Sequence, residues 1–185
     1  MPHSQQNIFL IGPMGSGKTT IGRQLAKLLG LDFYDCDHEL ERLTGASVNL
    51  IFDIEGEAGF RQRESRLLDE LSAKSGVLIA TGGGVVCLEE NRRMLRSRGF
   101  VVYLKTSIEQ QLLRLSKDKS RPLLQAQDRR QRLQELARVR NPLYAETADL
   151  VFNSRKSNIY ASAKALAEAI SERVNPETSN ANSQS

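Results

Sequence analysis

One glycine-rich run, GPMGSGKT at residues 12–19, constrains the fold of this chain more than any other feature. The run follows an apolar stretch at residues 8–11 and precedes an amphipathic pattern, so it lies where a strand passes into a helix. Its spacing, G-x-x-x-x-G-K-[ST], is that of a phosphate-binding P-loop, whose glycines let successive backbone N–H groups surround phosphate oxygens. The full spacing and its context disfavour the alternative, an ordinary glycine-rich turn. The sequence therefore predicts a nucleotide triphosphate site.

The side chains of this run supply the chemistry that such a site needs. The Lys18 ammonium is suited to neutralise the β- and γ-phosphates, and the Thr19 hydroxyl is suited to ligate Mg²⁺. The predicted nucleotide contacts are Gly15, Ser16, Gly17, Lys18, Thr19 and Thr20. A P-loop is shared by kinases, motors, switches and transporter subunits, so other features must choose among them. The sequence lacks the N-K-x-D element of switch GTPases, and motor and transporter ATPases have larger cores. A small-molecule kinase is favoured.

Length and composition limit the number of domains and the class of protein. A chain of 185 residues suits a single domain, predicted to span residues 1–175, followed by a polar tail at 176–185 that has little to bury and is expected to be disordered. The two cysteines, Cys36 and Cys87, have no metal-binding spacing, which is typical of a reduced cytoplasmic protein. No apolar run approaches the roughly 20 residues that span a bilayer. We expect no membrane segment, and a monomer.

Charge is distributed unevenly along the chain. Residues 31–60 carry eight acids and one arginine, whereas residues 114–140 carry nine basic side chains and three acids. Nucleic-acid binding is one explanation of such a basic stretch, but the stretch has no aromatic residue to stack on bases. We therefore favour anion handling within an active site and predict no nucleic-acid partner. Within this stretch, residues 116–127 have no sustained apolar period, which predicts a long loop acting as a lid.

Strand-like and helix-like patterns alternate, which predicts an α/β fold with parallel strands joined by helical crossovers. The predicted strands lie at residues 8–11, 33–35, 77–80, 100–104 and 150–152. Three apolar stripes at helical spacing predict helices that pack on the sheet: Ile21, Leu25, Leu28 and Leu29; Phe60, Leu67, Leu68 and Leu71; Ile159, Ala163, Leu166, Ala167 and Ile170. Gly30 follows the first stripe and is expected to end its helix.

A pair of carboxylates, Asp35 and Asp37, follows the second predicted strand. In an extended segment, residues i and i+2 project to the same side. One carboxylate would then help to hold Mg²⁺, while the other would accept a proton from a substrate hydroxyl during attack on the γ-phosphate. The alternative is a helix N-cap at Asp37. The upstream P-loop, which needs a metal partner, favours the functional interpretation. Cys36 between them is expected to face the core.

Taken together, the motifs resemble the shikimate kinase family from about residue 7 to residue 169. Besides the P-loop they are D-x-D at 35–37, G-E-x-x-F-R-x-x-E at 56–64, G-G-G at 82–84, R-P-L-L at 121–124 and R-x-P-x-Y at 140–144. The resemblance implies a three-layer α/β/α P-loop fold of the nucleoside-monophosphate-kinase type, with a five-stranded parallel sheet in the order 2-3-1-4-5. It also implies MgATP-dependent phosphorylation of the shikimate 3-hydroxyl in aromatic amino-acid biosynthesis.

The resemblance also implies roles for single residues. Asp37 would hold the shikimate hydroxyls and act as the base, and Asp35 would lie near Mg²⁺. Arg61 and Arg140 would clamp the substrate carboxylate, which suits a guanidinium fork that stays charged. The alternative for Arg61 is a surface ion pair with Glu64, which would otherwise orient it. The substrate pocket would be lined by the triplet Gly82, Gly83 and Gly84.

Three further arginines are assigned in the same way. Arg121 would close over the phosphates as part of the lid and stabilise charge on the transferring group. Arg114 and Arg155 would pack on adenine. Two other functions remain open from the residues alone: a kinase of another metabolite, such as gluconate or a nucleoside monophosphate, and a non-catalytic ATP-binding regulator. Intact Lys18, Asp37 and Arg121 disfavour the regulator.

Overall fold

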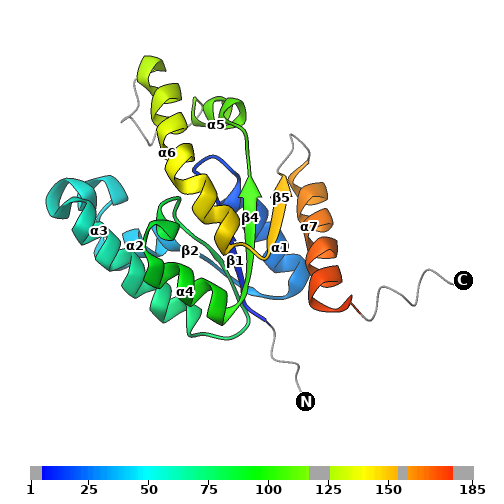
Figure 1. Ribbon diagram of the computed structural model, residues 1–185. Coiled ribbons are helices and arrows are strands. Elements are labelled where there is room, and N and C mark those ends of the chain that lie inside the picture. Colours follow the sequence, from blue (N-terminus) through cyan, green and yellow to red (C-terminus); the bar gives the residue numbers. More distant parts are fainter. Residues whose placement is uncertain (1–5, 117–125, 154–157, 177–185) are drawn as a thin grey trace, which may run out of the picture.

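A computed structural model describes residues 6–116, 126–153 and 158–176 of the chain. Five strands alternate with helices along these residues. Figure 1 shows how these elements are arranged in space. The strands are β1 (Ile8–Ile11), β2 (Asp32–Asp35), β3 (Val77–Ala80), β4 (Phe100–Lys105) and β5 (Leu150–Asn153). The α-helices are α1 (Lys18–Leu29), α2 (Cys36–Thr44), α3 (Val48–Ser72), α4 (Glu89–Arg98), α5 (Ile108–Leu115), α6 (Ala126–Thr147) and α7 (Ile159–Val174), and a short 3₁₀ helix, η1, spans Val85–Cys87. All five predicted strands are present within one residue of the expected bounds.

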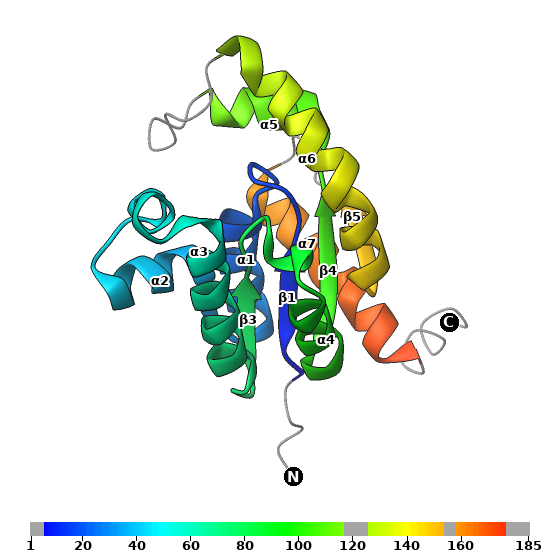
Figure 2. The ribbon, with the colours of Figure 1, turned by 60° about the vertical axis from the view of Figure 1, so that its left-hand side comes forward.

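The strands form one parallel sheet in the order β2-β3-β1-β4-β5. Helices α1 and α7 cover one face, and α3, α4 and α6 cover the other, so the molecule has three layers (Figure 2). Strand β1 lies at the centre, and all four of its residues are buried because both of its faces are covered. The predicted fold class and strand order are confirmed. The P-loop consequently extends from the most deeply buried strand.

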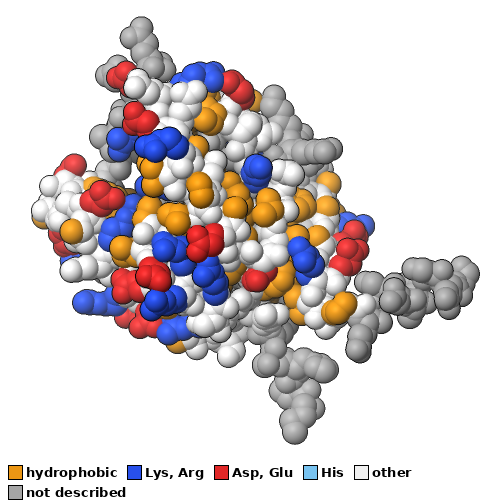
Figure 3. All heavy atoms as spheres, in the orientation of Figure 1, with side chains coloured by type: hydrophobic (Ala, Val, Ile, Leu, Met, Phe, Trp, Pro, Cys, Tyr) orange, Lys and Arg blue, Asp and Glu red, His pale blue; other side chains and the backbone are white. Residues whose placement is uncertain are grey.

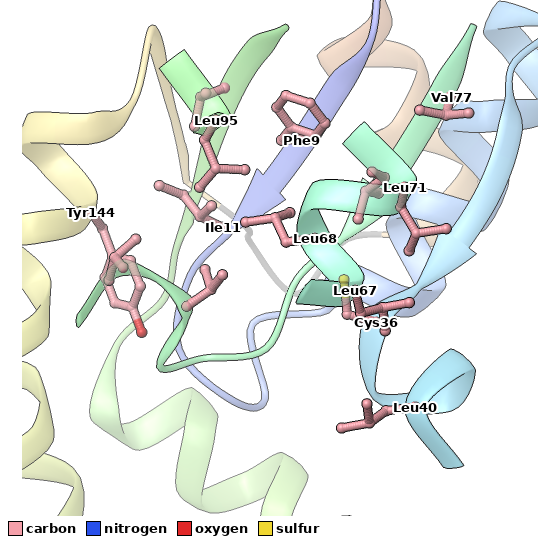
Figure 4. Packing of buried hydrophobic residues seen from close by; sticks show 14 of the residues in the cluster. Phe9, Ile11, Cys36, Leu40, Leu67, Leu68, Leu71, Val77, Leu95 and Tyr144 are labelled. Atoms are coloured by element: carbon pink, nitrogen blue, oxygen red, sulfur yellow. The ribbon is translucent and has the colours of Figure 1, made fainter. Parts of the chain in front are cut away.

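Two hydrophobic clusters hold the layers together. Alternate residues of β1 point to opposite faces, so Phe9 and Ile11 enter the cluster under α3 and α4, whereas Ile8 and Leu10 enter the cluster under α1 and α7. Figure 4 shows the first cluster, in which Leu68 lies close to the side chains of β1. The predicted stripe of α3 is buried there, and Cys36 joins the same cluster, as expected.

Helix α1 begins and ends at glycines with left-handed backbone. Gly17 precedes it at φ 90°, and Gly30 follows it at φ 67° and donates its N–H to the carbonyls of Ala26 and Lys27. The predicted end of this helix is therefore confirmed. Its stripe is narrower than predicted, because Leu28 is exposed to solvent. Three or four apolar positions per two turns already fill the face that meets the sheet, so an additional leucine lies beyond it.

Helix α3 is broken near its middle. Gly56 has φ 72° and ψ −178°, a conformation that side-chain-bearing residues rarely adopt, so α3 consists of two segments, residues 48–55 and 57–72. Across the break, Arg63 donates two hydrogen bonds to the Glu55 carboxylate, at 2.6 and 2.7 Å. The rings of Phe52 and Phe60 also stack across it, with centroids 4.3 Å apart. The first segment is thereby held at a fixed angle beside the carboxyl edge of the sheet.

Charged side chains are mixed on the face that carries α4 and α6, as Figure 3 shows. Three of the four arginines of α4 have an acidic partner: Arg93 pairs with Glu89, Arg96 with Glu146 and Arg98 with Asp69. Arg130 of the basic stretch likewise forms two hydrogen bonds with Glu109. Part of the basic stretch is thus a solvated, ion-paired helix face.

Several predictions fall on residues that the structure does not describe. Residues 117–125, with Arg121 and most of the predicted lid, lie outside the described residues, as do Arg155 and the tail from residue 177. The two ends of the predicted lid are described: Ser116 caps α5, and α6 begins at Ala126. None of the helices in the described ranges combines the length and the apolar composition needed to cross a membrane.

Candidate active site

The carboxyl ends of β1, β2 and β3 surround a cleft of about 680 Å³, a volume typical of small-molecule sites. Ligands of open α/β sheets bind at this edge because the loops that leave parallel strands gather there. The P-loop forms one wall. The first turn of α2, both segments of α3 and the glycine triplet form the other, with Arg114 and Arg140 at the rim.

The P-loop has the backbone conformation that a phosphate cradle requires. Gly12, Gly15 and Gly17 all have positive φ, at 148°, 78° and 90°. Lys18 follows at the start of α1 and is only 9% exposed; its ammonium donates to the carbonyls of Gly12 and Pro13, at 2.7 and 2.9 Å. The positive end of the α1 dipole and the lysine charge therefore meet at one place, which favours an anion there.

Two side chains of α5 hold the outer side of the P-loop. Gln111, which is 4% exposed, donates from Nε2 to the carbonyl of Met14 at 2.9 Å, and Arg114 donates from Nη1 to the carbonyl of Gly15 at 2.6 Å. Arg114 therefore lies beside the P-loop, on the cleft, where the nucleotide role expected for it is sterically possible. Thr20 also lines the cleft, but its hydroxyl donates to the carbonyl of Gly17.

Asp35 joins the P-loop helix to α2. Its Oδ2 accepts a hydrogen bond of 2.5 Å from the Thr19 hydroxyl, and its Oδ1 accepts from the backbone N–H of His38 at 3.0 Å. The local geometry predicted for the two aspartates is wrong. Asp35 is the N-cap of α2, and Asp37 lies in the first turn of that helix rather than in an extended segment. Both carboxylates nevertheless line the same cleft.

The glycine triplet lies against three charged side chains of the same wall. A Cβ at Gly82 would lie 2.7 Å from Glu64 Oε2 and 3.3 Å from Asp37 Oδ1, and a Cβ at Gly84 would lie only 2.2 Å from Arg61 Nη2. These charged groups thus occupy the space that a side chain at either glycine would need. This is a physical reason for glycine at both positions that does not involve φ, which is not in the left-handed region at either one.

Arg61 projects from the second segment of α3 and is held by two acids. Its Nη1 donates to Glu64 Oε1 at 2.9 Å, and its Nη2 lies 3.7 Å from Glu57 Oε1. The Arg61 Nε is buried and has no hydrogen-bond partner among the described residues. The ion pair with Glu64 that the sequence offered as an alternative is therefore present, but it lies in the cleft rather than on the surface.

Glu64 is the most buried charged side chain of this wall, at 3% exposure. Burial raises the pKa of its carboxyl above the ordinary value of 4.5, although the Arg61 guanidinium opposes the rise, while the neighbouring Asp37 carboxylate adds to it. Burial together with the Asp37 and Glu64 charges also raises the pKa of the Cys36 thiol, which keeps it protonated and unreactive.

Arg140 reaches the cleft from α6. Its Nη1 lies 3.6 Å from the position of a Cβ at Gly83, so the guanidinium lies over the middle of the triplet. One turn further along α6, the Tyr144 hydroxyl donates to the carbonyl of Gly83. Residues 61, 82–84 and 140, far apart in the chain, are thus brought together in one part of the cleft. This part adjoins the P-loop, since a Cβ at Gly83 would lie 3.5 Å from the backbone N of Met14.

Comparison with known proteins decides the family. A family model described as "Shikimate kinase" matches residues 14–172. The shikimate kinase of Histophilus somni is 51% identical over 167 residues, which cover 90% of this chain and 93% of that protein. The shikimate kinase of Acinetobacter baumannii, solved in complex with shikimate, superposes with a TM-score of 0.84 at 44% identity and covers 98% of this chain and 97% of that one. The chain belongs to the shikimate kinase family. The shikimate kinase of Aquifex aeolicus also superposes, with a TM-score of 0.78 at 35% identity, covering 91% of this chain and 98% of that one.

Membership of the shikimate kinase family confirms the predicted resemblance, the predicted kinase activity with ATP, and the predicted function at the level of the family. The roles of single residues in this member stay predictions. Of the assigned site residues, all except Ser16 and the undescribed Arg121 and Arg155 line the cleft. Ser16 is fully buried beneath the P-loop, where its hydroxyl accepts from the Lys18 ammonium at 3.4 Å.

Several cleft residues were missed or given a different role from sequence. Val48 and Phe52 line the wall formed by the first segment of α3, and Phe60 contributes to both the core and the cleft. Ile159 was assigned to the core stripe of α7, but it is 48% exposed and lines the cleft. Its position as the first residue of a helix that follows a strand's carboxyl end was the available signal.

Proposed function

We propose that the cleft transfers the γ-phosphoryl group of ATP to the 3-hydroxyl of shikimate, giving shikimate 3-phosphate and ADP in aromatic amino-acid biosynthesis. One observation carries the proposal: Arg61 and Arg140 meet the glycine triplet in one part of the cleft, the acceptor end, and the P-loop directly beside it forms the other, the nucleotide end. A small acid held at the first end would present a hydroxyl toward a phosphate chain held at the second.

The acceptor end fits a carboxylate on a compact ring. The guanidinium groups of Arg61 and Arg140, which both line the cleft, would bind the carboxylate, since planar forks of N–H donors match two carboxylate oxygens. Glu64 would hold Arg61 in place from behind. The glycine backbone would allow the ring to approach closely, and an uncharged polyol would leave both arginines without a partner.

Asp37 would orient the attacking hydroxyl and accept its proton. Its carboxylate lies on the cleft beside Gly82. As the acceptor oxygen bonds to the γ-phosphorus, the bond from that phosphorus to the ADP oxygen breaks and the hydroxyl proton passes to the carboxylate. Lys18 and the P-loop amides would stabilise charge on the phosphates during transfer.

The donor atoms at the P-loop fit Mg²⁺. The Thr19 hydroxyl and the Asp35 carboxylate are hard oxygen ligands already in contact with each other, and Mg²⁺ is usually held by one or two protein oxygens together with phosphates and water. Within the described ranges no group of three or more His, Cys, Asp or Glu side chains forms a separate metal site. When bound, the ion would neutralise charge that develops on the phosphates during transfer.

The remaining assignments belong to the same proposal. Arg121 would act from the lid, and Arg114 and Arg155 would flank adenine. Residues 1–175 would form a single kinase domain, active as a cytoplasmic monomer, with no nucleic-acid partner. Support for the three arginine assignments comes from motif positions and, for Arg114, from its place beside Gly15.

A coupled ADP-release assay with MgATP tests the function directly. Shikimate, gluconate and a set of nucleoside monophosphates would be compared as acceptors, and product mass would be checked for one added phosphoryl group. Turnover that depends on shikimate is expected. Turnover with a nucleoside monophosphate instead would retain the kinase but discard the carboxylate clamp, and turnover with gluconate would retain the clamp but discard the ring acceptor. ATP binding without any turnover would indicate a regulator.

A further inference from the structure

The carbonyl groups of the glycine triplet are not all held in the same way. The Gly82 carbonyl accepts from the backbone N–H of Val85 at 3.2 Å, and the Gly84 carbonyl accepts from that of Cys87 at 3.1 Å, so both are satisfied within the loop and η1. The Gly83 carbonyl instead accepts from the Tyr144 hydroxyl of α6. The middle of the loop therefore depends on a side chain that lies 61 positions away in the chain.

Tyr144 is placed to act as a fixed support. It is fully buried, and its ring packs on that of Tyr103 in β4, with centroids 5.1 Å apart. Burial strongly raises the pKa of the phenol, and the Arg140 guanidinium opposes this, which means that the hydroxyl stays protonated and that Arg140 lies close to it. Because Arg140 and Tyr144 are four residues apart on one helix, both face the triplet.

We propose that Tyr144 is a positioning residue, which fixes residues 82–84 against α6 and so sets the spacing between the triplet backbone and the Arg140 guanidinium. This proposal rests on the proposed function, because it concerns the acceptor end of that site. Tyr144 touches no reacting atom; it acts through Gly83 and Arg140. The spacing it sets is what a small carboxylate must match.

Kinetics of Tyr144→Phe test the proposal. The substitution removes one hydroxyl and keeps the ring on Tyr103, so the core should remain intact. The KM for shikimate is expected to rise about tenfold, in the range of a lost hydrogen bond, with kcat and the KM for ATP within about twofold of wild type. Tyr103→Phe is the matched control, since it removes a phenol hydroxyl from the same ring pair without touching Gly83.

Hydrogen exchange measured by NMR gives a second readout that needs no substrate. The Gly84 amide belongs to the peptide unit whose carbonyl Tyr144 holds, so its exchange should become faster in Tyr144→Phe and stay unchanged in Tyr103→Phe. Unchanged exchange, or a KM for shikimate within twofold of wild type, would overturn the proposal. So would equal changes in both KM values. If the wild-type protein does not phosphorylate shikimate, the proposed function is wrong, while the hydrogen-exchange result would still decide the role of Tyr144.

Discussion

The two ends of the cleft are built in opposite ways. The nucleotide end, residues 12–19 with Arg114, is made mostly of backbone from one continuous loop. The acceptor end consists of Asp37, Arg61, Glu64, residues 82–84 and Arg140, which come from four separate elements. The first end binds a group common to many substrates, and one local conformation is enough for it. The second must recognise one small acid, and only the completed fold brings its charges together.

The largest difference between the ends should appear at Asp37. Asp37→Asn removes the proposed base but keeps the shape of the side chain, so kcat should fall at least about a hundredfold, while ATP binding changes little. Asp32→Asn is the matched control, because Asp32 lies at the amino end of β2, away from the carboxyl ends of the strands that surround the cleft. It should leave kcat within about twofold. Steady-state kinetics with both substrates decide this, and a near-normal kcat for Asp37→Asn would remove the base from the acceptor end.

Arg61→Ala should separate the two ends by affinity. Loss of a charged hydrogen-bond donor from the carboxylate site is expected to raise the KM for shikimate about 10- to 100-fold, with the KM for ATP nearly unchanged. Arg66→Ala, five positions along the same helix and exposed, should change neither. If Arg61→Ala weakens ATP and shikimate equally, the division into two independent ends is wrong.

The glycine triplet offers a comparison within the acceptor end. Gly84→Ala places a methyl group 2.2 Å from Arg61 Nη2 and must displace that guanidinium, so the KM for shikimate should rise about tenfold. At Gly83 the nearest atom to a new Cβ is 3.5 Å away, an ordinary contact, so Gly83→Ala should have the smaller effect. Kinetics of the pair check this order, and the reverse order would show that backbone conformation, rather than space for Arg61, requires glycine.

At the nucleotide end, Asp35→Asn should act on the metal. Asparagine caps helices as well as aspartate does, so thermal stability should change little, but the lost charge should raise the Mg²⁺ concentration for half-maximal activity severalfold. Asp35→Ala should also lose about 1 kcal/mol of stability because the cap of α2 disappears. Magnesium titrations with thermal unfolding separate the two roles, and an unchanged titration for Asp35→Asn would place the ion elsewhere.

The smallest expected effect is the pH dependence of stability caused by Glu64. Because the pKa of its carboxyl is raised in the folded state, the native protein binds more protons than the unfolded chain above the ordinary value of 4.5. Stability therefore falls as pH rises from about that value to the raised pKa. In Glu64→Gln this part of the slope should vanish. Denaturant unfolding across that interval measures it, and identical slopes would contradict the raised pKa.

The two ends also differ in how far the sequence predicted them. The P-loop and the strand before it were predicted fully, because the residues that determine their conformation are neighbours in the chain. The convergence of Arg61, Gly84 and Arg140 was reached only through family resemblance, since no local pattern relates helix α6 to the loop after β3. Local propensity also placed Asp37 in an extended segment, whereas α2 already begins at Cys36 and has Asp35 as its N-cap. Ile159 was misassigned because helical spacing alone does not show where a helix projects past the sheet.

The break of α3 at Gly56 matters for the design of selective inhibitors. The segment after the break is anchored in the core through Leu67, Leu68 and Leu71, whereas the segment before it contributes Phe52 to the cleft and presents Ile54 to solvent at 74% exposure. An inhibitor that extends from the arginine end toward Phe52 would therefore contact a wall whose outer residues can vary among relatives at little cost to folding. Selectivity between related enzymes is best sought there, and broad potency at the glycine triplet.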